Sequence, residues 1–269
     1  MLIDKLLSIL QRDFLAARSY RIAFLLQFVG PIFLLLSFFF LARLLQTAVI
    51  PDLDRYGGDY FAFALVGIIF TSYVSLSLGT AAGNIRAYQA SGTLEVILTT
   101  RTGLGTVILG SSLYSFLSKT IFIAIYLLLA ATVFGVDFSQ ADPLTAFVAL
   151  AFMIVAMLGL GMLSASFILL FKRGDPVTLV LAQSSFLLSG VFYPVAVLPD
   201  WLQVGSSMLP HTYALEALRL GLLQGYSVLE VAPQLGAVAL FALAFLPLGY
   251  FAFQYALDRA RVEGSLGQF

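Results

Sequence analysis

Long stretches without a charged residue constrain this sequence most. Uncharged runs of 21, 26, 29, 24 and 27 residues lie between the pairs Arg21 and Arg43, Asp59 and Arg86, Asp142 and Lys172, Asp175 and Asp200, and Glu230 and Asp258. A helix needs about 20 mostly apolar residues to cross a bilayer, so each run is long enough to span one. A transmembrane β-barrel is excluded because barrel strands alternate polar and apolar residues.

A sixth span is predicted between Gly103 and Val136, a stretch interrupted only by Lys119. We place it at about 115–136, with Lys119 near one end, where a lysine side chain reaches the headgroups. The sequence therefore predicts an all-α polytopic membrane protein, a single domain over residues 1–269, with six transmembrane helices. Their expected positions are about 22–42, 60–81, 115–136, 146–171, 177–197 and 232–256.

The distribution of basic residues predicts the orientation. Six spans put both termini on one side, and that side holds Lys5, Arg12, Arg18, Arg21, Arg86, Arg101, Lys119, Lys172, Arg173, Arg259 and Arg261. The opposite side holds Arg43, Arg55 and Arg219. Lysine and arginine accumulate in cytoplasmic loops, so we expect both termini in the cytoplasm.

The first 19 residues predict an amphipathic helix in place of a signal peptide. Charged residues interrupt the region where a signal peptide has its apolar segment. Leu7, Leu10 and Phe14 recur at helical spacing on one face. We expect this helix to lie in the membrane interface, although a short solvated helix packed on the chain's own loops fits the same pattern.

Two segments are predicted not to cross the membrane as single helices. The first, about 85–98, contains the apolar cluster Leu94, Val96, Ile97 and Leu98 beside Glu95, which favours a short helix that binds a partner protein over a solvated loop. The second, about 198–225, predicts two short helices, one capped by Asp200 and one ending at Gly225, with Glu216 and Arg219 close enough to pair. We expect an external hairpin that dips into the outer leaflet, or else a helix pair lying flat on the membrane.

Several chemistries are missing from the sequence. His211 is its only histidine and it has no cysteine, so no metal site is predicted and catalysis by His211 is disfavoured. There is no G-x-x-x-x-G-K-[ST] sequence to bind ATP. The spans lack the acidic or histidine residues typical of ion-coupled transporters. Nucleic acid is not an expected partner, because 14 basic residues balance 14 acidic ones.

Two stretches resemble those of a known family, the permease subunits of type-2 ABC exporters for drugs, lipids and polysaccharides. Residues 91–100, Ser-Gly-Thr-Leu-Glu-Val-Ile-Leu-Thr-Thr, resemble the family's G-T-L-E-x-L-L-x-T-P stretch. Residues 190–219 resemble its G-x-x-F-P-x-x-x-L-P-x-W-L…L-P-x-T-Y…R stretch. The resemblance covers essentially the whole chain, although Arg101 stands where the family often has proline.

The resemblance implies a complex in the inner membrane of a prokaryote. Two permeases, identical or related, would pair, contact membrane lipids and bind two separate ATPase subunits that hold ATP and magnesium, while this chain carries no cofactor and no catalytic residue. Coupling to the ATPases would use Arg86, Gly92, Thr93, Leu94, Glu95 and Leu98. The external gate would be formed by Gly190, Phe192, Pro194, Pro199, Trp201, Pro210, Tyr213, Glu216 and Arg219.

Two other classes of function stay open. A membrane-embedded lipid-modifying enzyme would have to use Asp200, His211, Glu216 and Arg219, and an ATP-independent transporter or channel would move cargo without a partner. Within the exporter class, few charges in the spans suit an amphipathic drug or lipid-like cargo, and a glycan is equally compatible.

Overall fold

The computed structural model is entirely helical over the residues it describes, which are 2–19, 21–45, 50, 52–90, 92–93, 96–97, 104–171 and 176–262. Its long helices are α2 (Arg21–Leu44), α3 (Tyr60–Ala90), α5 (Leu104–Thr132), α6 (Pro143–Phe171) and α10 (Ala232–Val262). The shorter elements are α1 (Leu2–Ser19), η1 (Leu53–Tyr56), α7 (Pro176–Leu188), η2 (Val195–Val197), α8 (Asp200–Ser207) and α9 (Pro210–Gln224).

Four helices of the described chain are long and apolar enough to cross a membrane, at Tyr60–Thr80, Gly110–Thr132, Pro143–Phe171 and Ala232–Ala260. Gly30–Leu44 and Thr178–Leu188 form shorter apolar helices. The prediction of an all-helical, multi-pass membrane protein is therefore confirmed.

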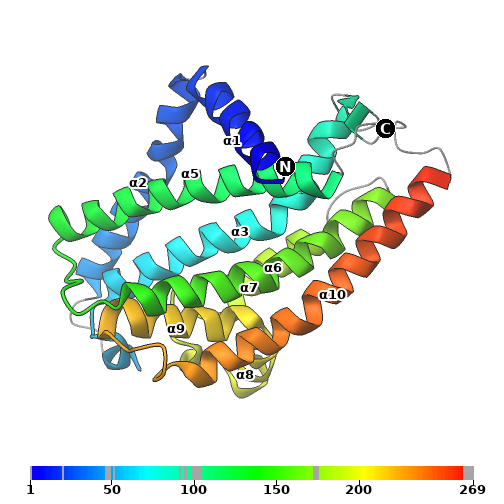
Figure 1. Cartoon of the computed structure of the whole chain (residues 1–269). Coiled ribbons are helices and arrows are strands. Elements are labelled where there is room, and N and C mark those ends of the chain that lie inside the picture. Colours follow the sequence, from blue (N-terminus) through cyan, green and yellow to red (C-terminus); the bar gives the residue numbers. More distant parts are fainter. Residues whose placement is uncertain are drawn as a thin grey trace.

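Helices α3 and α6 form the centre of the bundle. Helix α6 packs against α10, α3 and α9, which run alongside it (Figure 1). The first part of α3 is apolar on every side, and its residues from Phe61 to Phe70 are nearly all buried. A helix that is hydrophobic all round must be enclosed by others, so the sequence of α3 explains its central position.

Glycines allow α6 and α10 to approach each other closely. A Cβ atom at Gly159 would clash with the backbone of Phe245 and Leu246, and one at Gly249 would clash with the backbone of Gly159. Small residues at such crossings let the backbones of membrane helices come into contact. Helix α10 also presents Leu240, Leu243 and Phe251 outward, as expected for a surface that faces lipid.

The structure corrects three boundaries. Helix α3 continues to Ala90, so Arg86 lies in its last turns, and the chain then turns at Gly92 with φ +65°. Helix α5 begins at Leu104, which puts Lys119 well inside the helix and on its more buried side instead of near an end. Helix α7 ends at Leu188, because Gly190 adopts φ +72° and turns the chain before the expected end at residue 197.

The segment 198–225 forms the two expected helices, α8 and α9, with Gly225 in the left-handed conformation after α9. One detail differs from expectation, because Asp200 is the first residue of α8 and does not cap it. Pro210 begins α9, where its missing N–H costs no helical hydrogen bond. We call α8 and α9 together the hairpin, and the end of the bundle where α3 and α6 begin the hairpin end (Figure 1).

Candidate functional site

A buried arginine joins three elements at the hairpin end. Arg219 of α9 is 3% exposed. Its Nη1 donates a hydrogen bond to the carbonyl oxygen of Gly190 (2.8 Å), and its Nη2 donates to those of Val191 (2.7 Å) and Phe63 (3.2 Å). The guanidinium also lies 3.3 Å from the centre of the Phe63 ring. Arg219 thereby links α9 to the turn after α7 and to α3.

The sequence provides room for this contact. A Cβ atom at Gly67 would clash with the carbonyl oxygen of Val191, so only glycine lets the turn after α7 reach α3 here. Gly190 supplies the positive φ of that turn. Phe192 then stacks on Phe38 of α2, with ring centres 4.6 Å apart. The turn at 190–192 is thus held by α2, α3 and α9.

Glu216 does not pair with Arg219, as the sequence suggested, but with Arg55 of η1 at 2.5 Å. Burial lowers the pKa of Arg219 to about 9, while Tyr56 and Glu216 act in the opposite direction. The guanidinium therefore stays protonated at neutral pH and donates to the three carbonyl groups as a cation.

The remaining predicted gate residues differ in exposure. Pro194 and Pro210 are buried, whereas Pro199 and Trp201 are exposed, with Trp201 at 73%. The hydroxyl of Tyr213 donates to the carbonyl oxygen of Ser207, which ties α9 back to α8. The structure therefore brings Gly190, Phe192 and Arg219 together at one turn, places Glu216 with Arg219 on the wall of one cavity, and leaves Trp201 on the surface.

His211 is fully buried in the first turn of α9, and neither ring nitrogen has a hydrogen-bond partner among the described residues. Asp200 is exposed, and the cavity beside Glu216 and Arg219 is lined by neither Asp200 nor His211. The four residues that a lipid-modifying enzyme would have to use do not converge on one site.

Burial of His211 predicts a loss of stability in acid. Burial lowers its pKa to about 4, against about 6.5 in an unfolded chain. Between these values the unfolded chain binds more protons, so the free energy of unfolding falls as pH drops through this range. We expect a loss of about 2 kcal/mol between pH 7 and pH 5 from this residue.

The measurement is thermal unfolding of the purified chain at pH 7 and pH 5, compared with His211→Leu. Leucine removes the titrating group and two unpaired nitrogens while retaining an apolar side chain of similar length. The variant should lose clearly less stability than the wild type on acidification. An equal loss in both proteins would show that His211 contributes nothing to acid sensitivity.

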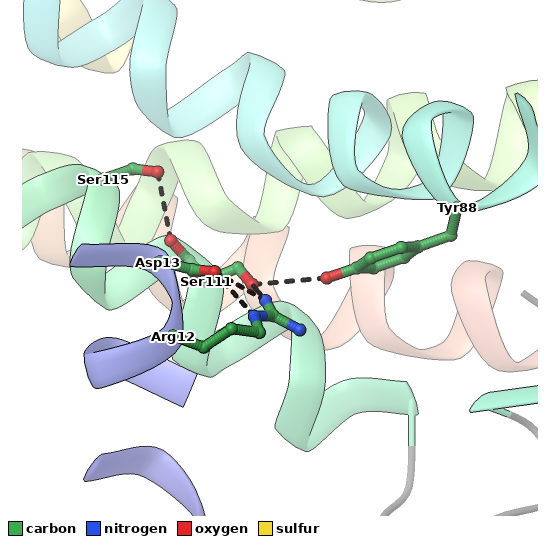
Figure 2. Close-up of polar contacts among 5 residues, drawn as sticks. All are labelled: Arg12, Asp13, Tyr88, Ser111 and Ser115. Carbon is green, nitrogen blue, oxygen red and sulfur yellow. Dashed lines mark hydrogen bonds and ion pairs between the residues drawn. The ribbon is translucent and has the colours of Figure 1, made fainter. Parts of the chain in front are cut away.

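A polar cluster lies at the other end of the bundle, where α1, α3 and α5 meet (Figure 2). Arg12 of α1 donates from Nη2 to the hydroxyl oxygen of Ser111 on α5 (3.1 Å) and from Nε to Asp13 (2.8 Å). The hydroxyl of Tyr88, on the last turns of α3, lies 3.3 Å from the same Ser111 oxygen. Phe63 and Tyr88 are 25 residues apart, so this cluster lies roughly 37 Å along α3 from the Arg219 contact.

Sequence reasoning missed Ser111 and Tyr88. The run Ser111, Ser112, Ser115 and Lys119 on one side of α5 was a possible indication, since polar residues in a membrane helix face other helices or water. Close packing positions the cluster, because a Cβ atom at Gly110 would come within 2.9 Å of the Ile9 side chain of α1.

Helix α1 forms as expected, but its predicted interface residues do not behave alike. Leu7 and Phe14 are each 57% exposed, whereas Leu10 is partly buried. Leu15 is also exposed, at 54%. Helix α1 thus packs on α5 through Ile9 and Arg12 and leaves an apolar strip of Leu7, Phe14 and Leu15 uncovered.

The predicted coupling residues are only partly described. Arg86, Gly92 and Thr93 are exposed, as is Val96 at 62%. Leu94, Glu95 and Leu98 lie outside the described residues. In the part of the chain that the structure covers, no group of three or more His, Asp or Glu side chains is placed to hold a metal ion.

These features define a multi-pass helical membrane protein with polar contacts concentrated at its two ends. Comparison with known proteins identifies the family within this class, because residues 4–223 match the family model "ABC-2 type transporter". The chain belongs to this family, whose members are the membrane components of transporters. It is 30% identical over 200 residues to "Nodulation protein J" of Sinorhizobium fredii (strain NBRC 101917 / NGR234), a match that covers 72% of this chain and 74% of that protein.

Proposed function

We propose that this chain is the transmembrane subunit of an ATP-driven exporter, which pairs with a second permease copy and with separate ATPase subunits. The observation that carries this proposal is the family match over residues 4–223, which includes both the segment at 85–98 and most of the hairpin. ATP and magnesium would bind to the ATPase subunits, because this sequence has no P-loop. The cargo would be an amphipathic drug, a lipid-like molecule or a glycan.

In this proposal the chain lies in the inner membrane of a prokaryote with six spans and both termini in the cytoplasm. The polar cluster of Arg12, Tyr88 and Ser111 would then lie at the cytoplasmic end. Helix α3 leads directly into the coupling segment, and Tyr88 contacts Ser111 two residues before α3 ends. A displacement of the coupling segment would thus reach α1 and α5 through this cluster. The apolar strip of α1 would rest on the membrane interface.

At the opposite end the hairpin would form the external gate. Gly67 lies seven residues after the start of α3 and contacts Val191. The turn after α7 therefore meets α3 roughly 10 Å along its axis from the hairpin end. Helix α9 returns toward the start of α6, where the Asp142 amide donates to the Gly221 carbonyl oxygen (2.8 Å). The turn that leads into the hairpin thus lies deeper in the bundle than the start of α3, which supports re-entry into the outer leaflet over a flat position on the membrane surface.

Reversing the charge of Glu95 tests the coupling assignment. We expect Glu95→Arg to insert and fold normally but to retain at least about tenfold less ATPase through purification, since a charge that meets a like charge across an interface costs several kcal/mol. Asp54→Arg is the matched control, because it makes the same charge change at the hairpin end, on an exposed residue. Equal ATPase recovery with wild type and Glu95→Arg would refute the docking assignment.

Single cysteines test the topology, because the chain contains none of its own. Val197 (52% exposed) and Met208 (67% exposed) flank the predicted gate and accept a probe more readily than the buried Pro194 and Pro210. We expect Val197→Cys and Met208→Cys to react with an impermeant maleimide added outside intact cells, and Val96→Cys to react only after lysis. Labelling in the opposite sense would overturn the orientation.

A further inference from the structure

A cavity of about 210 Å³ opens at the hairpin end between η1, the turn after α7, and the hairpin. By this measure one water needs about 15 Å³, so the cavity has room for a small molecule. Drug-sized ligands occupy pockets of roughly 300–1,000 Å³, so a single ring fits better than a large cargo. The cavity lies directly against the Arg219 contact.

Two buried polar groups on its wall lack hydrogen-bond partners within the part of the chain that the structure describes. They are the hydroxyl of Ser189, a residue that is only 2% exposed, and the Nε of Arg219, which is 3% exposed. Leaving such groups unsatisfied costs free energy, and in native proteins each calls for an explanation such as a bound molecule. A ligand in the cavity that accepts from Arg219 and bonds to Ser189 would remove both costs.

The charges on the wall select the kind of ligand. Asp52 and Glu216 are balanced by Arg55 and Arg219, and Glu216 is already paired with Arg55. An anion would face two carboxylates, and a cation would face two guanidinium groups. An uncharged ligand avoids both repulsions and the cost of burying an unpaired charge.

The other polar groups on the wall both donate and accept hydrogen bonds. They are the Tyr56 hydroxyl, the Thr212 hydroxyl, which already donates to the Ser206 carbonyl oxygen, and the side-chain amide of Gln203, whose Nε2 already donates to the Leu198 carbonyl oxygen. A molecule with several hydroxyl groups complements such a mixed surface, because each hydroxyl also donates and accepts. The Tyr56 ring adds an apolar face of the kind that a sugar ring can cover.

We propose that this cavity binds an uncharged, hydroxyl-rich unit of the cargo, such as one sugar ring, as the cargo leaves through the external gate. This assignment rests on the proposed function and extends it by naming a substrate class. Because Arg219 contacts both the cavity and the turn at Gly190–Val191, an occupant would bear directly on the gate.

Binding can be measured on the full chain in nanodiscs through Trp201, its only tryptophan. Trp201 lies on α8 two residues before Gln203, which lines the cavity. Three probes share one ring and differ in charge: methyl α-glucoside is neutral, glucose 6-phosphate is anionic and glucosamine is cationic. We expect a saturable fluorescence change with methyl α-glucoside in the millimolar range, and roughly tenfold weaker binding of both charged probes.

Two serines give a matched pair of variants. Ser185 and Ser189 are one helical turn apart and both buried with unpartnered hydroxyls, but only Ser189 lines this cavity. Ser189→Ala should weaken binding of methyl α-glucoside roughly fivefold, the worth of one hydrogen bond, and Ser185→Ala should leave it unchanged. No saturable binding, stronger binding of a charged probe, or equal effects of the two variants would overturn the proposal.

A second experiment distinguishes binding of a unit of the cargo from binding of an unrelated sugar at the external side. In the reconstituted complex with its ATPase, methyl α-glucoside added outside should change the rate of ATP hydrolysis saturably, and Ser189→Ala should shift that response to higher concentration. Binding with no effect on hydrolysis would contradict the assignment to cargo. Failure to recover an ATPase would instead count against the proposed function, because the binding arm uses this chain alone.

Discussion

Arg219→Ala is expected to destabilise the protein by about 3–5 kcal/mol and to abolish transport. The substitution removes three hydrogen bonds from a buried cation and leaves the carbonyl oxygens of Gly190, Val191 and Phe63 without this donor. It also leaves a void against the Phe63 ring. For a chain of this length the loss corresponds to a fall of roughly 10 °C in melting temperature. Thermal unfolding in detergent measures it.

Two further variants test whether the loss of stability in Arg219→Ala comes from its hydrogen bonds to the three carbonyl groups. Arg55→Ala also removes an arginine near Glu216, but its side chain is 54% exposed, so we expect a loss of at most about 1 kcal/mol. Arg219→Lys retains the charge but cannot reach three carbonyl groups in the planar geometry of a guanidinium, so it should fall between the wild type and alanine. Similar losses from Arg219→Ala and Arg55→Ala would contradict the role given to Arg219.

Gly249→Ala is expected to have the second largest effect, by separating α6 from α10. The added methyl group would meet the backbone of Gly159, which cannot move aside as a flexible side chain can. Overpacking a tight core costs about 1–3 kcal/mol and more where backbone must shift. We expect a melting temperature lower by roughly 5–10 °C and a smaller monodisperse fraction after extraction.

Gly236→Ala is the matched control on the same helix. A Cβ atom at Gly236 would meet nothing within 4 Å, and alanine favours helix over glycine by about 1 kcal/mol. This variant should therefore be neutral or slightly more stable. If Gly236→Ala proved as harmful as Gly249→Ala, general intolerance of α10 to alanine would explain both results better than the α6–α10 contact.

The positions of the long helices followed from the sequence because membrane thickness sets a minimum length for an uncharged run. Helices α6 and α10 correspond closely to runs bounded by charges, and Gly225 marked the end of the second helix of the hairpin. The end of α7 was not predictable in this way. Its position depends on Gly67 and Arg219, which contact the turn at residues 190–191 from other helices.

The candidate sites were predictable only where they depend on local sequence. The resemblance directed attention to Gly190 and Arg219, but their partners lie up to 156 residues away, as for Arg219 and Phe63. Glu216 illustrates the difficulty, because spacing on the helix favoured Arg219 and folding supplied Arg55. The cluster of Arg12, Tyr88 and Ser111 was missed because each residue alone is an ordinary surface or helix residue.

The most direct test of the account is the composition and activity of the complex purified through this chain from its native membrane. We predict that the chain is recovered with an ATPase subunit that contains a P-loop, and that the purified complex hydrolyses ATP, with Glu95→Arg reducing both the amount of ATPase recovered and the hydrolysis. Recovery of the chain alone, in a form that moves cargo across reconstituted vesicles without ATP, would contradict it.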